Sequence, residues 1–191
     1  MMSDKIFNEI YNSKASVTKV CNNIISPWIT IAEKEVLFCP EDEKQTYHSL
    51  ILSDYVSVLA RTPSGMIPVV RQFRPAVEQY TWELPAGLVN SGEKPETAAK
   101  RELEEEVRVK TNDIKHMGTT FVDTGRLNNR VYMFYVECSE PIPEYQEEKG
   151  IEIKFIKPEE LKQAIITSEF DHQIHIASLF MATLHGFKWD R

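Results

Sequence analysis

The amino-acid sequence predicts a mixed α+β layered domain. Runs of alternating apolar and polar residues, which are typical of strands, recur along most of the chain. Helix-like segments interrupt them in the middle and near the C-terminal end, so strands precede helices in some places and alternate with them in others. With 191 residues, 42% of them hydrophobic and 27% charged, the chain can bury a core without metal or disulfide staples.

The first quarter of the chain predicts an antiparallel hairpin unit, over residues 17–55. Residues 5–16 are compatible with a short helix. Residues 27–39 alternate apolar and polar side chains and predict a strand, and residues 45–53 predict the strand that returns. The polar segment between these two strands is expected to be a turn.

Two strands, a loop and a helix are expected next. Residues 55–75 predict two strands around a turn that Pro63 and Gly65 provide. Residues 83–95 form a loop punctuated by glycine and proline, and Pro95 suits the first turn of the following helix. Apolar residues then recur at helical spacing, at Ala98, Ala99, Leu103 and Val107.

The C-terminal part returns to strands before it becomes helical. Strands are expected over residues 112–121, 129–138 and 151–156, with a polar loop over residues 141–150. A further helix is expected after Pro158.

Residues 172–187 predict a strongly apolar last helix, which Gly186 is expected to stop. Phe180 and Met181 are expected in the core. The histidines of this segment have no metal-ligand context in the sequence: His172, His175 and His185.

Charge and cysteine usage exclude several classes of protein. Twenty-two basic and 29 acidic residues give a net charge of −7, so no nucleic-acid partner is expected. No apolar run approaches the roughly 20 residues of a membrane helix, and the N-terminus has no apolar signal region. The three widely spaced cysteines suggest neither a disulfide framework nor a zinc site, so a cytoplasmic location is expected.

Four glutamates crowd into residues 102–106. On a helix with about 100° per residue, Glu102, Glu105 and Glu106 fall within an arc of roughly 100°. Glu104 points nearly the opposite way, and the apolar residues of the helix form a third face. The pattern therefore predicts one apolar face, one solvated charge and one triplet of carboxylates.

Geometry alone leaves two interpretations of the triplet open. Like charges four residues apart cost about 0.2–0.5 kcal/mol per pair, and Lys100 and Arg101 are expected to point away from that face. The face is either a solvated acidic surface or a site for Mg²⁺ or Mn²⁺, because magnesium prefers carboxylate, water and phosphate oxygens. A divalent cation would also offset the repulsion between this acidic chain and an anionic substrate.

The spacing around the triplet resembles the Nudix box of the Nudix hydrolases, G-x5-E-x7-R-E-U-x-E-E-x-G-U, where U is aliphatic. Gly87, Glu93 and Arg101 begin the match, and every fixed position agrees except one. Arg108 stands where the family has a glycine, which permits a left-handed exit from the helix. A non-glycine residue in that conformation costs on the order of 1 kcal/mol.

The flanking sequence "VVRQFRPAVEQYTWELPAGLVNSGE" resembles the ADP-ribose and nucleoside diphosphate sugar pyrophosphatases, in which an RQFRP strand and a PAG loop lead into the box. The resemblance implies a Nudix α/β/α sandwich over residues 56–191. It also implies a small N-terminal antiparallel β-domain over residues 1–55 that helps to form a homodimer.

By this resemblance Glu102, Glu105 and Glu106 are metal ligands, directly or through water, and Glu105 is counted among the catalytic residues. The carbonyl of Ala86 is the usual additional ligand. The implied cofactor is Mg²⁺ or Mn²⁺, which would bridge the pyrophosphate oxygens and activate water.

The resemblance gives other box residues a structural role. Glu93 and Arg101 are expected to form an ion pair that shapes the loop, and a direct contact with the substrate is the alternative for Arg101. Arg74 is the preferred cation on the phosphate side, because a guanidinium can bind phosphate with two hydrogen bonds.

The general base of this subgroup lies outside the box, on a loop before a late strand. Glu147 and Glu148 are the candidates in this chain, ahead of Glu144 and Glu152. A base must reach the attacking water and have a suitable pKa, and either residue could instead belong to an acidic surface loop.

Aromatic residues are expected to hold the nucleobase. Trp28 and Tyr47 match positions where aromatic rings sandwich adenine in ADP-ribose pyrophosphatases, and buried strand residues are the alternative. Arg126 is a candidate contact for sugar or phosphate, or a structural residue of its loop. His48 and Leu52 replace polar or charged residues that are common there, so base and sugar stay open.

Together these features predict a Mg²⁺-dependent hydrolase of the pyrophosphate bond of a nucleoside diphosphate sugar. ADP-ribose, cleaved to AMP and ribose 5-phosphate, is the leading substrate. The alternatives are another nucleotide sugar, such as ADP-glucose or GDP-mannose, or a Nudix-fold module that binds a nucleotide without turnover.

Overall fold

The computed structural model describes residues 15–39, 42–142 and 150–189. The chain divides into two compact units, one of residues 1–52 with 123–128 and one of residues 53–122 with 129–191. Most of the helix expected over residues 5–16 lies outside the described residues, and its described end is coil and strand.

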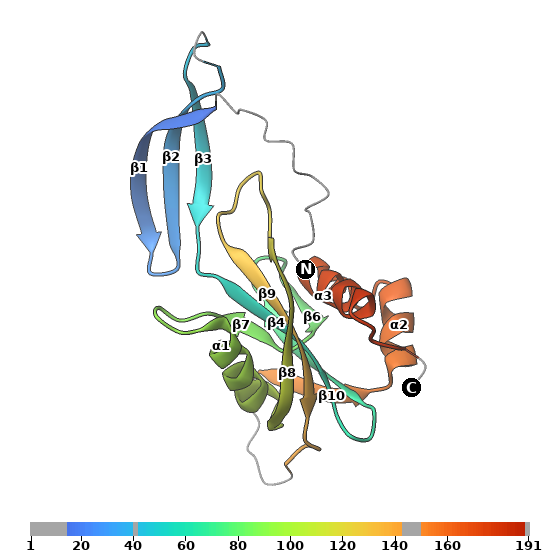
Figure 1. The fold of residues 1–191 in the computed structure, drawn as a ribbon. Helices are drawn as coiled ribbons and strands as arrows, with labels where there is room; N and C mark the ends of the chain where they lie inside the picture. Colours follow the sequence, from blue (N-terminus) through green and yellow to red (C-terminus); the bar gives the residue numbers. More distant parts are fainter. Residues whose placement is uncertain (1–14, 40–41, 143–149, 190–191) are drawn as a thin grey trace, which may run out of the picture. The chain divides into compact units, whose positions relative to one another are not determined.

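The first unit is a three-stranded antiparallel sheet in the order β1-β2-β3 (Figure 1). Its strands are β1 (Ser16–Ser26), β2 (Ile29–Leu37) and β3 (Gln45–Ile51). The predicted hairpin is confirmed as β2 and β3, but the sequence did not predict β1. The pairing of β1 with β2 shifts register twice, and such bulges disturb the alternation by which a strand is recognised in a sequence.

A distant loop completes the first unit. The N–H of Leu50 donates to the carbonyl of Arg126 at 2.8 Å, and the N–H of Asn128 donates back to the carbonyl of Leu50 at 3.2 Å. The side-chain oxygen of Asn128 also accepts the N–H of Leu52 at 3.0 Å. Residues 123–128 therefore extend the edge of β3.

The second unit contains a four-stranded sheet in the order β7-β4-β9-β8. Its strands are β7 (Ala86–Leu88), β4 (Tyr55–Arg61), β9 (Arg130–Cys138) and β8 (Thr111–Phe121). β4 and β9 pair in parallel, whereas the other pairs are antiparallel. The strand β7 lies within residues 83–95, where a loop was expected. The sequence did not predict it, because a strand of three residues is too short to show an alternating pattern.

A second sheet of this unit has the order β10-β5-β6, formed by β10 (Ile151–Ile156), β5 (Ile67–Arg74) and β6 (Gln79–Glu83). The two strands predicted on either side of the Pro63–Gly65 turn are confirmed as β4 and β5. They do not pair with each other, because each joins a different sheet.

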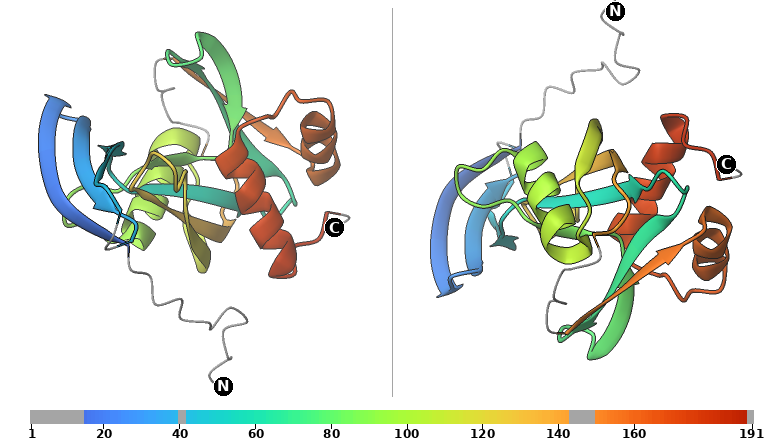
Figure 2. Two further views of the ribbon diagram at one scale, coloured as in Figure 1. Left: turned by 90° about the horizontal axis from the view of Figure 1, so that it is seen from above. Right: turned by 90° about the horizontal axis from the view of Figure 1, so that it is seen from below.

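Helices cover the four-stranded sheet on two sides. α1 (Pro95–Glu102) and α3 (Gln173–Leu184) lie on opposite sides of its strands (Figure 1), and α2 (Pro158–Ile166) follows β10 (Figure 2). Alternate residues of β4 point to opposite faces of the sheet and pack into two hydrophobic cores. Val56, Val58 and Ala60 pack with α1, whereas Leu59 packs with Leu179 and Ala182 of α3.

Two details of the predicted helices are wrong. The helix expected after Pro95, with apolar residues as far as Val107, is α-helical only to Glu102 and continues as a π-helical turn, η1 (Leu103–Val107). Phe180 is 63% exposed rather than in the core. The stop at Gly186 is confirmed by its φ of 95° and by the N–H of Phe187, which donates to the carbonyl of Ala182 at 2.9 Å. In the described part of the chain no helix is long and apolar enough to cross a membrane.

Candidate functional site

Two box carboxylates lie against the backbone of β7. Glu106 Oε2 accepts the N–H of Ala86 at 3.0 Å. A Cβ atom on Gly87 would lie 2.0 Å from Glu102 Oε1, so only a glycine leaves room for that carboxylate. The fold therefore brings Ala86, Glu102 and Glu106, which were predicted as metal ligands, to one place.

Arg101 joins Glu105 to this group. Its Nη1 donates to Glu102 Oε1 at 2.7 Å and to Glu105 Oε2 at 3.1 Å. The expectation that Arg101 points away from the carboxylate face is therefore wrong. The reason is reach, because the guanidinium lies at the end of a long side chain and contacts both Glu93 before the helix and Glu105 after it.

The same guanidinium holds the loop before the helix. Arg101 Nε and Nη2 donate to the two carboxylate oxygens of Glu93 at 3.1 and 3.0 Å, and Nη2 donates to the carbonyl of Leu88 at 3.0 Å. Glu93 Oε2 also accepts the N–H of Asn90 at 3.0 Å. Arg101 thus connects the loop, the end of β7 and two carboxylates of the triplet.

The three carboxylates differ in their surroundings. Glu102 and Glu106 are 9% and 7% exposed, whereas Glu105 and Glu104 are exposed. Burial raises the pKa of Glu102 against the opposing hydrogen bond from Arg101, and the charges of Glu105 and Glu93 raise it further. Crowded carboxylates of this kind gain from a nearby cation.

This donor set suits a hard divalent metal. Mg²⁺ and Mn²⁺ bind carboxylate and carbonyl oxygens. Glu102 and Glu106 offer carboxylates beside the backbone of β7, and Arg101 connects Glu105 to Glu102. The residues present therefore fit the predicted cofactor.

The end of the acidic segment has a left-handed exit, although the family's glycine is absent there. Arg108 follows η1 with φ 63° and ψ 37°, in the conformation that the family's glycine adopts without strain. The departure from the motif therefore changes the residue and keeps the turn.

Arg74 lines a different part of the second unit. Its Nε and Nη2 donate to Glu83 Oε1 and Oε2 at 2.7 and 2.5 Å, and its side chain is 35% exposed. It borders a cavity of about 510 Å³ together with Tyr55, Thr81 and His172. Burial raises the pKa of Tyr55, and Glu83 and Glu106 raise it further against Arg74. Tyr55 thus lies within the electrostatic reach of both Arg74 and Glu106.

His172 and His175 have neighbours that the sequence did not reveal. They and Glu83 place one ligand atom each within 4.8 Å of one another, a grouping that the sequence did not indicate. The group nevertheless does not fit a metal. A carboxylate has about four lone-pair positions, and donors from Arg74, Thr81 and His175 already use four at Glu83.

The predicted nucleobase residues lie in the first unit. Tyr47 and Arg126 border one cavity of about 620 Å³. Trp28, in the turn between β1 and β2, is 70% exposed, and Tyr47 is 41% exposed, so neither is a buried strand residue. Tyr47 packs edge-on against Phe38 with ring centroids 5.9 Å apart.

The candidate bases Glu147 and Glu148, like Glu144, lie outside the described residues. The remaining candidate, Glu152, accepts a hydrogen bond from Arg71 at 3.2 Å and pairs with Lys154 at 3.4 Å.

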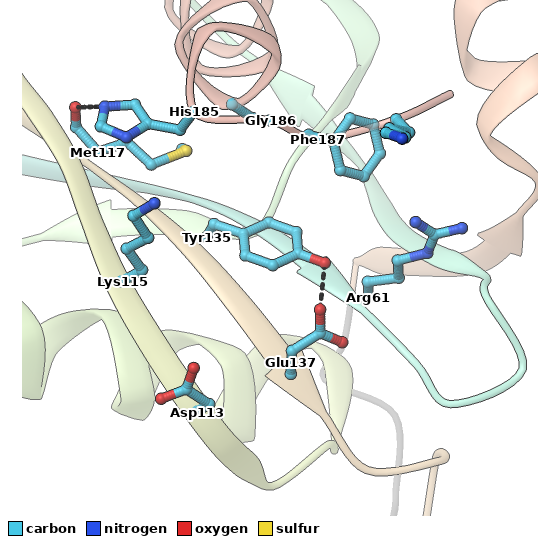
Figure 3. A pocket seen from close by; sticks show the side chains of 11 residues that line it. Arg61, Asp113, Lys115, Met117, Tyr135, Glu137, His185, Gly186 and Phe187 are labelled. Carbon is cyan, nitrogen blue, oxygen red and sulfur yellow. Dashed lines mark hydrogen bonds between the residues drawn. The ribbon is translucent and has the colours of Figure 1, made fainter. Parts of the chain in front are cut away.

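A further cavity, of about 340 Å³, lies beside the C-terminal end of α3 (Figure 3). Its wall mixes opposite charges, including Arg61, Lys115 and Glu137, and the hydroxyl of Tyr135 donates to Glu137. None of the predicted site residues lines it, so it is separate from the carboxylate group.

Helix carboxylates that lie against the backbone of a glycine-containing strand form a site that can hold a divalent cation. The family model described as "NUDIX domain" matches residues 52–176. The chain therefore belongs to the Nudix family.

Curated relatives carry related names. The chain is 32% identical to the ADP-ribose pyrophosphatase of Bacillus subtilis over 117 residues, which cover 60% of this chain and 63% of that protein. It is 35% identical to the ADP-sugar pyrophosphatase of Mus musculus over 112 residues, 53% of this chain and 51% of that protein. A 76-residue match to the yeast (Saccharomyces cerevisiae) ADP-ribose pyrophosphatase has 42% identity and covers 40% of this chain and 33% of that protein. The chain thus spans less than two thirds of each.

The fold is also that of a solved structure described as an ADP compounds hydrolase. The TM-score is 0.75 with 17% identity, and the match covers 90% of this chain and 93% of that one. The predicted α+β Nudix fold is confirmed.

Proposed function

We propose that this protein is a metal-dependent hydrolase that cleaves the pyrophosphate bond of a nucleoside diphosphate sugar, with ADP-ribose as the leading substrate and AMP and ribose 5-phosphate as products. The observation that carries the proposal is the contact of Glu102 and Glu106 with Ala86 and Gly87. The names of the relatives support the substrate class.

The chain's own residues would divide the work as follows. Glu102, Glu105 and Glu106, with the carbonyl of Ala86, would hold Mg²⁺ or Mn²⁺, which when bound would neutralise the diphosphate and activate water. Arg101 and Glu93 would keep the carboxylates and the loop in place. Glu147 or Glu148 would accept the proton of the attacking water.

Substrate contacts outside the box are proposed from their positions. Arg74 would contact a phosphate, because Glu83 occupies only two of its five N–H donors and the side chain borders a cavity. Trp28, Tyr47 and Arg126 would contact base and sugar, and two of them already border one cavity. Stacking on such rings contributes about 1–3 kcal/mol per base.

We also propose the boundary between an N-terminal dimerisation region over residues 1–55 and a catalytic domain over 56–191. Exposed apolar residues on β1 and its turn support a homodimer, among them Ile24 at 76% and Trp28 at 70% exposure. Light scattering of Ile24→Asp against the unchanged protein tests the dimer.

The free thiols of Cys21, Cys39 and Cys138 support a cytoplasmic location.

The activity is tested with a substrate panel. ADP-ribose, ADP-glucose and GDP-mannose are incubated with the protein and Mg²⁺, and the released sugar phosphate is measured. Turnover of none of them would exclude the proposed reaction and favour a nucleotide-binding module. Preference for ADP-glucose or GDP-mannose would retain the reaction and change the sugar.

Glu105→Gln separates catalysis from binding, and Glu104→Gln is its matched control. Both residues are exposed neighbours in η1, but only Glu105 contacts Arg101. We expect Glu105→Gln to lower kcat by at least about 10²-fold, because the uncharged amide is a weaker ligand for the metal that would activate water. Nucleotide affinity should stay within a few fold, and Glu104→Gln should resemble the unchanged protein.

A further inference from the structure

The guanidinium of Arg74 is bound by a carboxylate that has no exposure to solvent. Glu83 is 0% exposed, lies in β6, and binds Arg74 through both of its oxygens. Such a two-point contact fixes the plane of the guanidinium as well as its position. The direction in which Arg74 faces its cavity therefore depends on what holds Glu83.

Glu83 is itself held by two other groups. Thr81 Oγ donates to Glu83 Oε1 at 2.6 Å, and His175 Nε2 lies 3.3 Å from Glu83 Oε2. Burial opposes ionisation of Glu83, but the hydrogen bonds from Arg74, His175 and Thr81 outweigh it and hold its pKa well below the ordinary value. The carboxylate is therefore ionised and accepts at both oxygens.

The ionised carboxylate fixes the direction of a longer hydrogen-bond chain. Because Glu83 can only accept, His175 Nε2 must carry a hydrogen and donate it. In the neutral ring Nδ1 is then an acceptor, and it lies 3.0 Å from Ser57 Oγ, which must be its donor. Ser178 Oγ can donate its one hydrogen to Ser57 Oγ at 2.8 Å or to the carbonyl of Ile174 at 3.0 Å.

The residues of this hydrogen-bond chain that lie beyond Glu83 are all buried. Ser57, His175 and Ser178 are each 0% exposed, and they come from β4 and α3. Burial lowers the pKa of His175 to about 4, so the ring is neutral near pH 7. Ser57 and His175 each have one arrangement of hydrogens that satisfies them, which leaves Glu83 little freedom to rotate.

We propose that Ser57, His175 and Ser178 are positioning residues that act through Glu83 to hold Arg74 toward the cavity for a phosphate of the substrate. The proposal rests on the proposed function, in which Arg74 contacts that phosphate. It adds three buried residues, two of them on the last helix, to the residues on which substrate binding depends.

Three variants test the positioning. Ser57→Ala removes the donor to His175 with a small change of volume, and His175→Leu removes the donor to Glu83. His175→Gln restores an N–H toward Glu83 and is the conservative rescue. Leu179→Val, a buried change on the same helix outside the hydrogen-bond chain, is the matched control for lost packing.

The first readout is the steady-state kinetics with ADP-ribose. We expect Ser57→Ala and His175→Leu to raise KM about tenfold, which corresponds to about 1.4 kcal/mol of binding, with kcat changed less than about threefold. His175→Gln should recover most of the loss. Leu179→Val should lower Tm without changing KM.

The second readout does not require turnover. In a ¹H–¹⁵N spectrum the Nε–H resonance of Arg74, assigned by its loss in Arg74→Lys, should shift or broaden in Ser57→Ala and stay in place in Leu179→Val. An unmoved resonance, or the same rise of KM in Leu179→Val, would overturn the proposal. If the unchanged protein hydrolyses no nucleotide sugar, the proposed function fails, and the spectra of Ser57→Ala and His175→Leu still decide whether these residues hold Arg74.

Discussion

Arg101 Nη1 donates to Glu102 Oε1 at 2.7 Å, so the arginine of the box binds a carboxylate of the triplet beside it. The same nitrogen reaches Glu105 at 3.1 Å. Without a metal, this guanidinium is the cation that relieves the repulsion within the triplet.

Replacing Arg101 with Met should therefore make the protein more dependent on metal. Loss of the charged hydrogen bonds to Glu93, Glu102 and Glu105 should lower the free energy of unfolding by about 1–3 kcal/mol. Mg²⁺ should then raise Tm more in Arg101→Met than in the unchanged protein, because the carboxylates have lost their own cation. Thermal unfolding with and without Mg²⁺ measures both effects.

Lys100→Met is the control for Arg101→Met. Lys100 lies one residue earlier and pairs with the exposed Glu96 at 2.6 Å, outside the triplet. An equal gain from Mg²⁺ in both variants would contradict the role given to Arg101.

Gly87→Ala should disable the site with little loss of stability. The new Cβ would lie 2.0 Å from Glu102 Oε1, and the flexible end of Glu102 can move away cheaply. The displaced carboxylate should weaken Mn²⁺ binding, measured by electron paramagnetic resonance, and lower kcat/KM at least about tenfold. Leu88→Ala, an exposed neighbour on β7, should leave Mn²⁺ affinity and Tm close to those of the unchanged protein.

The stability of the protein should fall as the pH falls from about 6.5 to 4, through the pKa values of His175 in the unfolded and folded states. Burial lowers the folded-state pKa, against the hydrogen bond to Glu83, so the unfolded state binds more protons in this window. The contribution of His175 to the free energy of unfolding is fully present above pH 6.5. As the pH falls, about 1.4 kcal/mol is lost for each unit by which folding lowers the pKa of His175.

Urea unfolding at several pH values measures this slope. His172, Glu83 and Arg74 are the charged or titratable groups that act on His175. His175→Gln should flatten the curve between pH 6.5 and 4, and a slope that persists in this variant would show that other groups cause it. Below pH 4.5 the lowered pKa of Glu83 adds a loss of the same sign.

The left-handed conformation of Arg108 should be visible as a difference between two variants. Arg108→Gly and Arg108→Ala both lose the side chain, but only alanine keeps the strain at φ 63°. The glycine variant should be more stable than the alanine variant by about 1 kcal/mol. Equal midpoints of denaturation would mean that the turn is not strained.

The parts of the site that lie close together in the sequence could be predicted from it. The spacing from Gly87 to Glu106 identified the carboxylates, because a helix converts spacing directly into direction. The apolar face of the same helix followed from the spacing of Ala99, Leu103 and Val107, which are all buried. These predictions needed only local geometry.

The parts that depend on distant contacts could not be predicted. Glu83 and His175 are 92 residues apart, and no local pattern records that α3 carries the histidine to β6. The direction of Arg101 was wrong because spacing places a Cβ atom and not the end of a long side chain. Strand β1 was missed because its bulges interrupt the period by which strands are recognised.

The parallel pairing of β4 with β9 has a consequence for folding during synthesis. Tyr55 of β4 pairs with Val131 of β9, so the ribosome must add more than 70 residues after β4 begins before this pairing can start. β7 and α1 emerge much earlier and pack on β4 through local contacts. A nascent chain that ends after residue 110 already contains Gly87 and the acidic helix, whereas both β9 and the helix that carries His175 have yet to be made.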